Sequence, residues 1–238
     1  MLHTIIWFFY FWCYLIVCIP ATLWVIHLEK SGQTERADKQ TRKFVRNWAG
    51  RLLKLAGARV TVEGTENVPA GAAVYIANHT SYFDIPLMLT YVGEPRGFMA
   101  KIEADKIPGI RVWMRRLHCL FVDRSSATSG ATVLREGEKM LREGYSLTIF
   151  PEGTRSKNGE LLEFKPGAFR IATMAKAPIV PVTIIGARAM MEDNGNRITS
   201  GDVKIVIHPA IETASLSRPE IRTLPEAVRD TIGGPLQK

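Results

Sequence analysis

Cysteine is scarce in this chain, with only three among 238 residues. Cys13 and Cys18 lie in an apolar N-terminal stretch, and Cys119 lies in a segment predicted to form a buried strand. Neither their number nor their spacing suits a disulfide framework or a zinc site. We therefore expect a reducing compartment and no bound metal.

Signatures of several large enzyme classes are missing as well. No glycine-rich loop matches the phosphate-binding loop of nucleoside triphosphatases or the fingerprint of dinucleotide-binding domains. No Gly-x-Ser-x-Gly run is present, which argues against a serine hydrolase. The chain is long enough for one sizeable core and shows no internal repeat. One globular domain with a different chemistry is therefore predicted.

Residues 5–28 contain no Asp, Glu, Lys or Arg but include Trp7, Trp12 and Trp24. This length reaches the roughly 20 residues needed to span a bilayer. The stretch has no small-residue cleavage site and no preceding Lys or Arg, which argues against a removed signal peptide. We predict a membrane-associated helix, kinked at Pro20, and leave open whether it crosses the bilayer or enters one leaflet.

Residues 39–59 lack acidic side chains and carry seven basic ones. The formal charges are −1 for residues 1–38, +7 for residues 39–59 and +2 for the rest, which together give +8. A nucleic-acid-binding protein would spread such charge along a groove with interleaved aromatic residues, so no nucleic-acid partner is predicted. The pattern instead predicts a basic amphipathic helix on an anionic membrane surface, with the body on the cytoplasmic side of the inner membrane. The apolar face comprises Phe44, Val45, Trp48, Leu52, Leu55 and Ala56, and the basic face comprises Arg42, Lys43, Arg46 and Lys54.

Strand-like and helix-like segments alternate from residue 59 onward. Such alternation predicts an α/β fold with a mixed central sheet flanked by helices. It also divides the chain into an N-terminal membrane anchor of residues 1–58 and a domain of residues 59–238. The predicted strands cover residues 59–62, 72–77, 98–101, 119–122, 146–150, 179–185 and 203–208, and the predicted helices cover residues 85–92, 108–116, 127–142, 167–175 and 218–232.

His79 and Asp84 lie five positions apart across a predicted strand-to-helix turn. About 0.15 such pairs are expected by chance in a chain with 5 His and 7 Asp. A second pair, His118 and Asp123, falls in a predicted strand, where the two side chains would face opposite sides roughly 17 Å apart. Only the first pair can therefore fold into an acid/base dyad; the structural alternative is a capping aspartate beside a core histidine.

A second polar run, at residues 150–156, follows another predicted strand. It offers a carboxylate at Glu152, a glycine at Gly153 and a cation at Arg155. Both runs lie just after strands, where sites gather in α/β folds. Together they indicate a base that removes a proton from a hydroxyl of a phosphate-bearing substrate.

Four blocks of this sequence resemble the signature blocks of the glycerolipid acyltransferases. Asn78-His79-Thr80-Ser81-Tyr82-Phe83-Asp84 is similar to the first, His-x4-Asp, block, and Phe150-Pro151-Glu152-Gly153-Thr154-Arg155-Ser156 to the third. Phe121-Val122-Asp123-Arg124 and Ala177-Pro178-Ile179-Val180-Pro181-Val182 resemble the second and fourth. The order and spacing, over roughly residues 58 to 210, are those of the bacterial lysophosphatidate (1-acylglycerol-3-phosphate) acyltransferases.

The resemblance implies a role for each block residue. His79 is expected to be the general base and Asp84 to orient its ring. Arg124 and Arg155 hold the family's positions for the substrate phosphate, and Lys101 is a further candidate. Glu152 is expected to orient the glycerol or an arginine, while Gly153 and Thr154 shape the turn of the substrate site.

The implied reaction moves an acyl chain from acyl-CoA or acyl carrier protein to the sn-2 hydroxyl of lysophosphatidate, which gives phosphatidate. No cofactor beyond this thioester co-substrate is expected. Alternatives that stay open are another lysolipid or glycerol-3-phosphate as acceptor, and transacylation between phospholipids. A catalytically silent membrane-binding protein is a further alternative, although such a protein would normally have lost His79 or Asp84.

Overall fold

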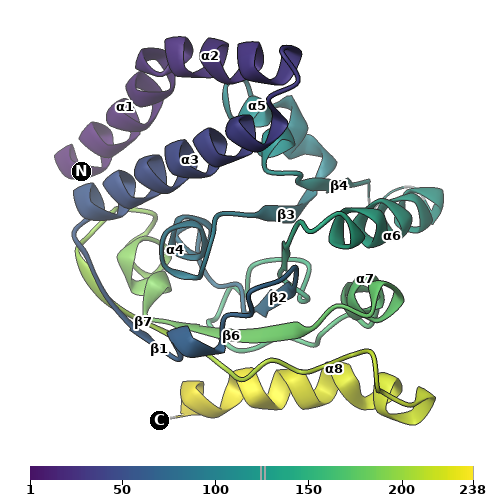
Figure 1. The fold of residues 1–238 in the computed structure, drawn as a ribbon. Helices are drawn as coiled ribbons and strands as arrows, with labels where there is room; N and C mark the ends of the chain where they lie inside the picture. Colours follow the sequence, from purple (N-terminus) through teal and green to yellow (C-terminus); the bar gives the residue numbers. More distant parts are fainter. Residues whose placement is uncertain (124, 126, 238) are drawn as a thin grey trace.

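A seven-stranded sheet forms the middle layer of the molecule in a computed structural model that describes residues 1–123, 125 and 127–237 (Figure 1). The strand order is β1-β7-β6-β2-β5-β3-β4. Neighbouring strands are parallel except for β6 and β7, so the sheet is mixed, as predicted. The strands are β1 (Ala58–Glu63), β2 (Val74–Ala77), β3 (Gly97–Lys101), β4 (Leu120–Val122), β5 (Leu147–Ile149), β6 (Ile179–Ile185) and β7 (Gly201–Ile207).

Helices cover both faces of this sheet, and the sheet separates two apolar cores. Because side chains alternate along a strand, Tyr75 and Ala77 of β2 enter one core, whereas Val74 and Ile76 enter the other. The helices on the first side include α4 (Asp84–Tyr91) and α5 (Ile110–Arg116), and those on the second are α6 (Ala127–Arg142), α7 (Gly167–Ala175) and α8 (Arg218–Gly233). All seven predicted strands and five predicted helices of the body are confirmed, with ends that differ by at most two residues.

The apolar N-terminal stretch forms a bent pair of helices, α1 (Leu2–Val17) and α2 (Ile19–Lys30). Their axes turn by 43° at Cys18, and a proline occupies the first turn of α2. Proline is tolerated there because the first N–H groups of a helix have no acceptor within that helix, so its missing donor costs no hydrogen bond. Among the described residues, no single helix is long and apolar enough to cross a membrane. The two helices of this bent pair, taken together, have the length and composition of a membrane span.

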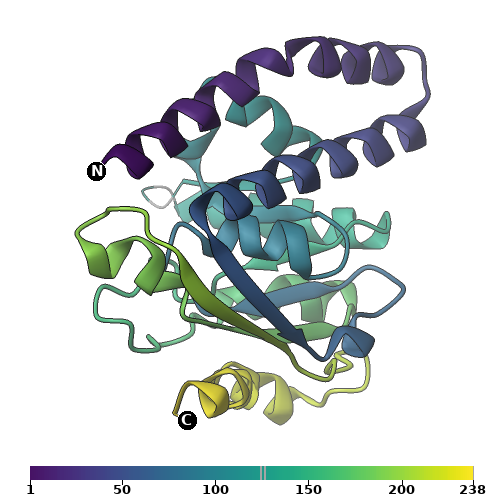
Figure 2. The same cartoon turned by 90° about the vertical axis from the view of Figure 1, so that its left-hand side faces the viewer.

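The basic helix α3 (Thr34–Ala56) begins five residues before the predicted start and includes the polar residues that precede the basic stretch. It lies between the α1–α2 pair and α4 (Figure 2). Val45 and Leu52 of α3 share a core with Leu87 of α4, and Trp7 of α1 donates its indole N–H to the Leu52 carbonyl at 2.9 Å. The apolar face of α3 is therefore buried within the protein. Most of the exposed large apolar side chains belong to α1 and α2, and a membrane role for residues 1–58 stays a prediction.

Gly64, directly after β1, supports a test of how closely the chain packs at the β1–β7 edge. Its φ is +79°, and a Cβ added there would lie 1.9 Å from the Ile207 carbonyl oxygen. Gly64→Ala should lower the free energy of unfolding by about 2 kcal/mol or more, since both the left-handed backbone and the clash oppose a side chain. Chemical denaturation in detergent measures this. Gly71→Ala is the matched control, because nothing lies within 4 Å of its added Cβ; an equal loss in both variants would contradict the prediction.

Candidate active site

The turn between β2 and α4 brings His79 and Asp84 into contact. His79 Nδ1 lies 2.8 Å from Asp84 Oδ2, and the same oxygen accepts the backbone N–H groups of Thr80 and Ser81 at 2.8 Å each. Asp84 is the first residue of α4, where the helix N-terminus favours a negative charge. Its side chain is fully buried, while 15% of the His79 side chain stays exposed. The predicted contact is therefore present, and the catalytic roles of the two residues stay a prediction.

This contact and an aromatic neighbour fix the orientation of the His79 ring. A carboxylate oxygen can only accept, so Nδ1 carries the proton and Nε2 keeps its lone pair. The Phe150 ring stacks on the imidazole with a centroid distance of 4.1 Å and an interplanar angle of 14°. Nε2 is thus the ring nitrogen able to take a proton from a substrate.

The second histidine–aspartate pair is separated, as the strand prediction required. His118 precedes β4 and Asp123 follows it, so the residues lie beyond opposite ends of one strand. His118 contacts Tyr145 instead, with a centroid distance of 3.8 Å. The spacing of five positions therefore produces a dyad only at the turn.

The turn of residues 150–156 holds the backbone of His79 on both sides. Glu152 Oε1 accepts the His79 N–H at 2.7 Å, and the Ser156 N–H donates to the His79 carbonyl at 2.8 Å. Glu152 Oε2 accepts the Leu162 N–H at 3.1 Å. Burial raises the pKa of the Glu152 carboxyl, and the two N–H donors act in the opposite direction. Through these contacts Glu152 positions the backbone of His79. The substrate role predicted for Glu152 stays a prediction.

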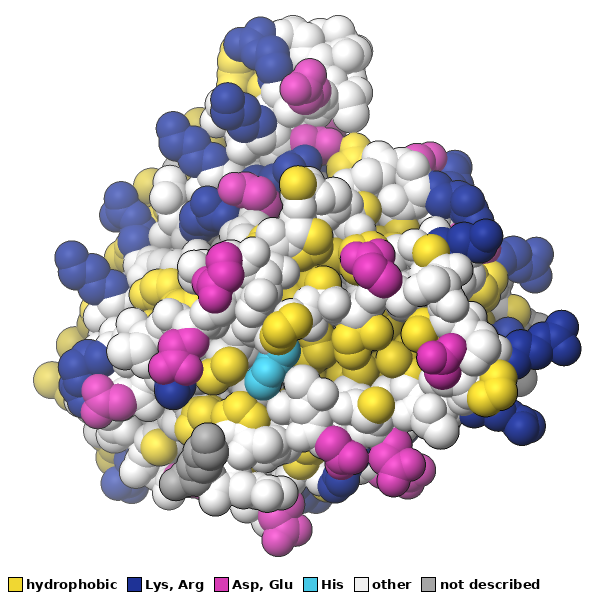
Figure 3. All heavy atoms as spheres, turned by 60° about the horizontal axis from the view of Figure 1, so that its bottom comes forward, with side chains coloured by type: hydrophobic (Ala, Val, Ile, Leu, Met, Phe, Trp, Pro, Cys, Tyr) yellow, Lys and Arg dark blue, Asp and Glu magenta, His cyan; other side chains and the backbone are white. Residues whose placement is uncertain are grey.

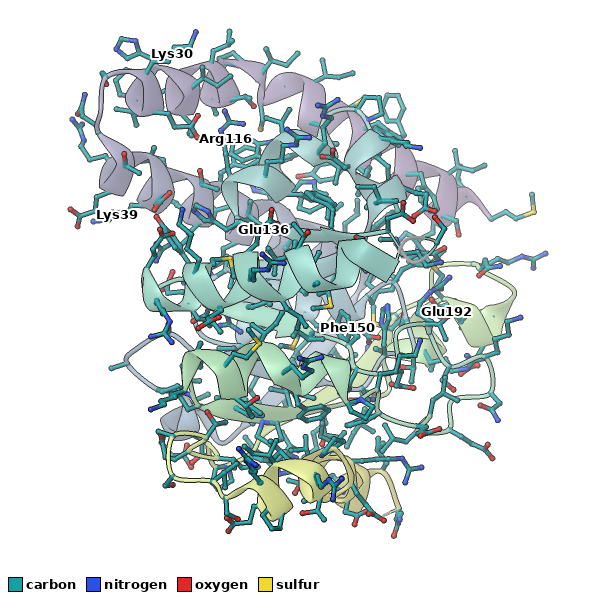
Figure 4. All side chains as sticks on the ribbon, turned by 90° about the vertical axis from the view of Figure 1, so that its right-hand side faces the viewer. Lys30, Lys39, Arg116, Glu136, Phe150 and Glu192 are labelled. Atoms are coloured by element: carbon teal, nitrogen blue, oxygen red, sulfur yellow. The ribbon has the colours of Figure 1, made fainter. Side chains whose placement is uncertain are left out.

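Arg155 contacts two residues, Glu192 and Tyr82, beside the turn between β2 and α4. Its Nη1 lies 3.0 Å from Glu192 Oε1, and its guanidinium carbon lies 3.5 Å from the Tyr82 ring centroid. Glu192, in the 3-10 turn Glu192–Asn194, also accepts from Ser81 Oγ at 2.7 Å and from the Tyr82 N–H at 2.9 Å. One carboxylate therefore joins the two polar runs, and Figure 4 shows it on the same side of the molecule as Phe150.

The remaining predicted site residues lie around this edge of the sheet. Gly153 has a φ of +71°, and a Cβ there would lie 2.9 Å from Lys165 Nζ, so glycine suits both the turn and its neighbour. Thr154 is exposed. Lys101 is exposed at the end of β3, and the parallel strands place that end at the same edge as His79. Arg124 lies outside the described residues.

Sequence reasoning missed three contributors to this arrangement. Glu192 stands 111 positions from Ser81 in a loop without a motif, so no local signal identifies it. Phe150 and Asn78 belong to the polar runs, but their roles depend on tertiary contacts. The Asn78 amide pairs with both backbone groups of Ile184 in β6, at 2.8 and 2.9 Å. It thereby fixes the end of β2 from which His79 projects.

Comparisons with known proteins agree with this geometry. A family model described as Acyltransferase matches residues 59–185. A probable 1-acyl-sn-glycerol-3-phosphate acyltransferase of Mycoplasma pneumoniae is 36% identical over 146 residues, which cover 59% of this chain and 54% of that protein. A chloroplastic 1-acyl-sn-glycerol-3-phosphate acyltransferase of Brassica napus is 35% identical over 64% of this chain and 45% of its own length. The chain thus spans about half the length of these two relatives.

Two further proteins match over more of their length. The 1-acyl-sn-glycerol-3-phosphate acyltransferase of Borreliella burgdorferi is 34% identical over 182 residues, which cover 76% of this chain and 72% of that protein. The crystal structure of the 1-acyl-sn-glycerophosphate acyltransferase PlsC from Thermotoga maritima superposes with a TM-score of 0.86 at 30% identity, covering 99% of this chain and 94% of that one. With its sheet, its His-x4-Asp turn and these matches, the chain belongs to the acyltransferase family.

Proposed function

We propose that this protein is a 1-acylglycerol-3-phosphate O-acyltransferase. It transfers an acyl chain from a thioester to the sn-2 hydroxyl of lysophosphatidate and releases phosphatidate for phospholipid synthesis. The observation that carries the proposal is the 2.8 Å contact between His79 and Asp84, held at the sheet edge by the 150–156 turn. The names of the matching relatives support the choice of acceptor.

The reaction needs a base, an acyl acceptor and a route for one proton. His79 Nε2 takes the proton of the acceptor hydroxyl, whose oxygen attacks the carbonyl carbon of the thioester. Asp84 stabilises the imidazolium that results. The tetrahedral intermediate then expels the thiolate as the C–S bond breaks, and His79 returns the proton to sulfur. The thioester of coenzyme A or of acyl carrier protein is the co-substrate, and the proposed chemistry uses no further cofactor.

Arg155 is the proposed contact for the substrate phosphate. Its planar guanidinium suits phosphate because it donates two parallel hydrogen bonds. About 31% of its side chain is exposed, and its ion pair with Glu192 holds it beside the catalytic turn. Lys101, at the same sheet edge, and Arg124, from the family resemblance, complete the proposed phosphate site.

An exposed apolar stripe on α1 supports attachment to a membrane. Its residues recur every three or four positions, so they occupy one helix face, and each is at least 46% exposed. The neighbouring α3 keeps Lys39, Lys43 and Lys54 exposed, which suits an anionic lipid surface. We place this stripe in the cytoplasmic leaflet of the inner membrane, next to the lipid acceptor. The stripe comprises Leu2, Ile5, Phe9, Trp12 and Ile16.

The identity of the acyl donor is a separate part of the proposal. Acyl carrier protein is acidic and would dock best on a basic patch. On the face shown in Figure 3, hydrophobic side chains occupy the middle, and lysine and arginine side chains lie mainly at the margins beside acidic ones. This distribution favours neither donor, so the purified enzyme should be assayed with both thioesters against lysophosphatidate and other acceptors.

His79→Ala should reduce acyl transfer to lysophosphatidate by about 10²- to 10⁴-fold or more, because general-base catalysis is lost. The rate is measured with labelled acyl donor, and thermal unfolding checks that the variant is folded. His118→Ala is the control, since His118 belongs to the pair that β4 separates, and it should keep its activity. Turnover at the wild-type rate in folded His79→Ala protein would refute the mechanism.

Arg155→Ala should raise the KM for lysophosphatidate about 10- to 100-fold, since a hydrogen bond to a charged group contributes about 1.5–3 kcal/mol. The phosphate is unchanged during acyl transfer, so kcat should change little. Arg155→Lys should restore part of the affinity. Arg59→Ala, which removes an exposed ion pair with Asp202, should leave both constants unchanged. A rise confined to the donor KM would show that Arg155 binds the donor instead.

Replacing Phe9, Trp12 and Ile16 together with serine should reduce binding to phospholipid vesicles at least tenfold, because each buried apolar side chain contributes about 1.5–3 kcal/mol. Flotation with vesicles measures the bound fraction. Tyr91→Ser changes an exposed apolar residue on α4 and should bind like the wild type. Unchanged flotation of the triple variant would exclude this face as the membrane contact.

A further inference from the structure

A cavity of about 420 Å³ lies at the edge of the sheet opposite the candidate active site. Its lining includes Ala72, Arg96, His118 and Ser146, which directly precede β2, β3, β4 and β5 or lie within two residues of their starts. These four strands run parallel, so their first residues share one edge and His79 follows the other. In Figure 4, Arg116, which lines the cavity, lies to the left of the centre of the molecule, and Glu192 lies to the right.

Arg96 is a buried cation in the wall of this cavity. Only 6% of the residue is exposed, and its guanidinium carbon lies 3.5 Å from the Tyr75 ring centroid. Its Nη2 donates to the Val92 carbonyl, whereas its buried Nη1 has no hydrogen-bond partner within the described part of the chain. Burial lowers the pKa of Arg96 to about 10, so the side chain keeps its charge at neutral pH. A buried N–H without a partner is unfavourable, so an anion that reached Arg96 from the cavity would be stabilised by it.

Two further arginines and a histidine line the same cavity. His118 Nε2 and Arg116 Nε are also buried without hydrogen-bond partners among residues 1–123, 125 and 127–237, although the other two nitrogens of Arg116 donate to Glu29 and to the Val112 carbonyl. Arg42, half-buried on α3, forms no ion pair with any described acid. Donors from α3, from α5 and from the loops before β3 and β4 therefore converge on one space.

The carboxylates of the cavity already have partners. Asp38 accepts the Tyr145 hydroxyl at 2.8 Å and lies 3.9 Å from His118, and Glu94 forms an ion pair with Arg46 at 3.2 Å. Arg116 is paired as well, with Glu29 at 2.8 Å, whereas Arg42 and Arg96 form no ion pair among the described residues, and the lining carries a net positive formal charge. A cavity with this charge and with unused donors suits an anion.

The backbone of His118 indicates that the site is rigid. Its φ is +59°, a left-handed conformation that non-glycine residues adopt at a cost of about 1–3 kcal/mol. Gly97 approaches it so closely that an added Cβ would lie 2.5 Å from the His118 carbonyl oxygen. Such strained residues persist where the surroundings hold them, and they are frequent at ligand sites.

We propose that this cavity binds a phosphate-monoester anion at a site separate from the catalytic pair. Arginine forks match phosphate oxygens bidentately, and the Ser146 hydroxyl can donate a further hydrogen bond to the anion. The volume falls in the range of small-molecule sites, about 300–1,000 Å³. The phosphate can belong to a soluble metabolite or to a lipid headgroup, since both present the same group.

Histidine-ring NMR of the full chain in detergent tests the proposal at the cavity itself. With inorganic phosphate added at constant ionic strength, the His118 resonance should shift and saturate. Arg42→Gln should raise the Kd from this resonance about 10- to 100-fold and leave acyl transfer unchanged, because Arg42 lies outside the catalytic edge. Lys43→Gln, an exposed neighbour on α3, should bind like the wild type.

A parallel titration with dihexanoyl phosphatidate distinguishes the two sources of phosphate. Saturation by inorganic phosphate alone supports a soluble phosphate monoester, saturation by the lipid alone supports a headgroup ligand, and saturation by both shows that the cavity recognises the phosphate group itself. The proposal is overturned if the His118 resonance shifts with neither probe. It is also overturned if the Kd measured from this resonance is the same in Arg42→Gln as in the wild type. Arg96→Gln serves as a second variant, with thermal unfolding to show that it is folded.

Discussion

The arrangement at the sheet edge depends on the hydrogen bonds between His79 and the turn of residues 150–156. Glu152 accepts the His79 N–H, and the Ser156 N–H donates to the His79 carbonyl, across a separation of 73 positions between His79 and Glu152. Both runs follow parallel neighbours, β2 and β5, which deliver them side by side. A displacement of either turn would therefore break bonds to the other. Asp84 can orient the His79 ring only because this backbone is already fixed.

A second dependence links the N-terminal helices to the same turn. Phe83 and Leu87 flank Asp84 in sequence and are buried in the core that α1, α2 and α3 complete. Trp7 of α1 contacts Phe83 with a centroid distance of 5.7 Å. The segment with the exposed apolar stripe thus packs on the helix that begins with Asp84. In the proposed function, membrane contact and catalysis share one core, so residues 1–58 contribute to the fold as well as to attachment.

The sequence predicted the elements well because their signals are local: apolar strands and amphipathic helices. The His79–Asp84 contact was also predictable, since only a turn brings residues five positions apart together. Strand order and the partners of Glu152 were not, because both are set by contacts between distant segments. Glu192 lies in a loop without a motif and acquires its importance only from where the fold places it. The apolar face of α3 was predictable, but what covers it was not.

The ion pair between Arg155 and Glu192 changes what phosphate affinity means at this site. A substrate phosphate that takes the Arg155 fork must replace or share the carboxylate that lies 3.0 Å from it. Binding is therefore an exchange of one anion for another, and the measured affinity reports the difference between two interactions. A doubly charged phosphate monoester gains more from that exchange than a singly charged phosphodiester. The charge of the phosphate therefore lets the proposed site prefer lysophosphatidate over the bulk phospholipids around it, while displacement of the carboxylate lowers the affinity for both.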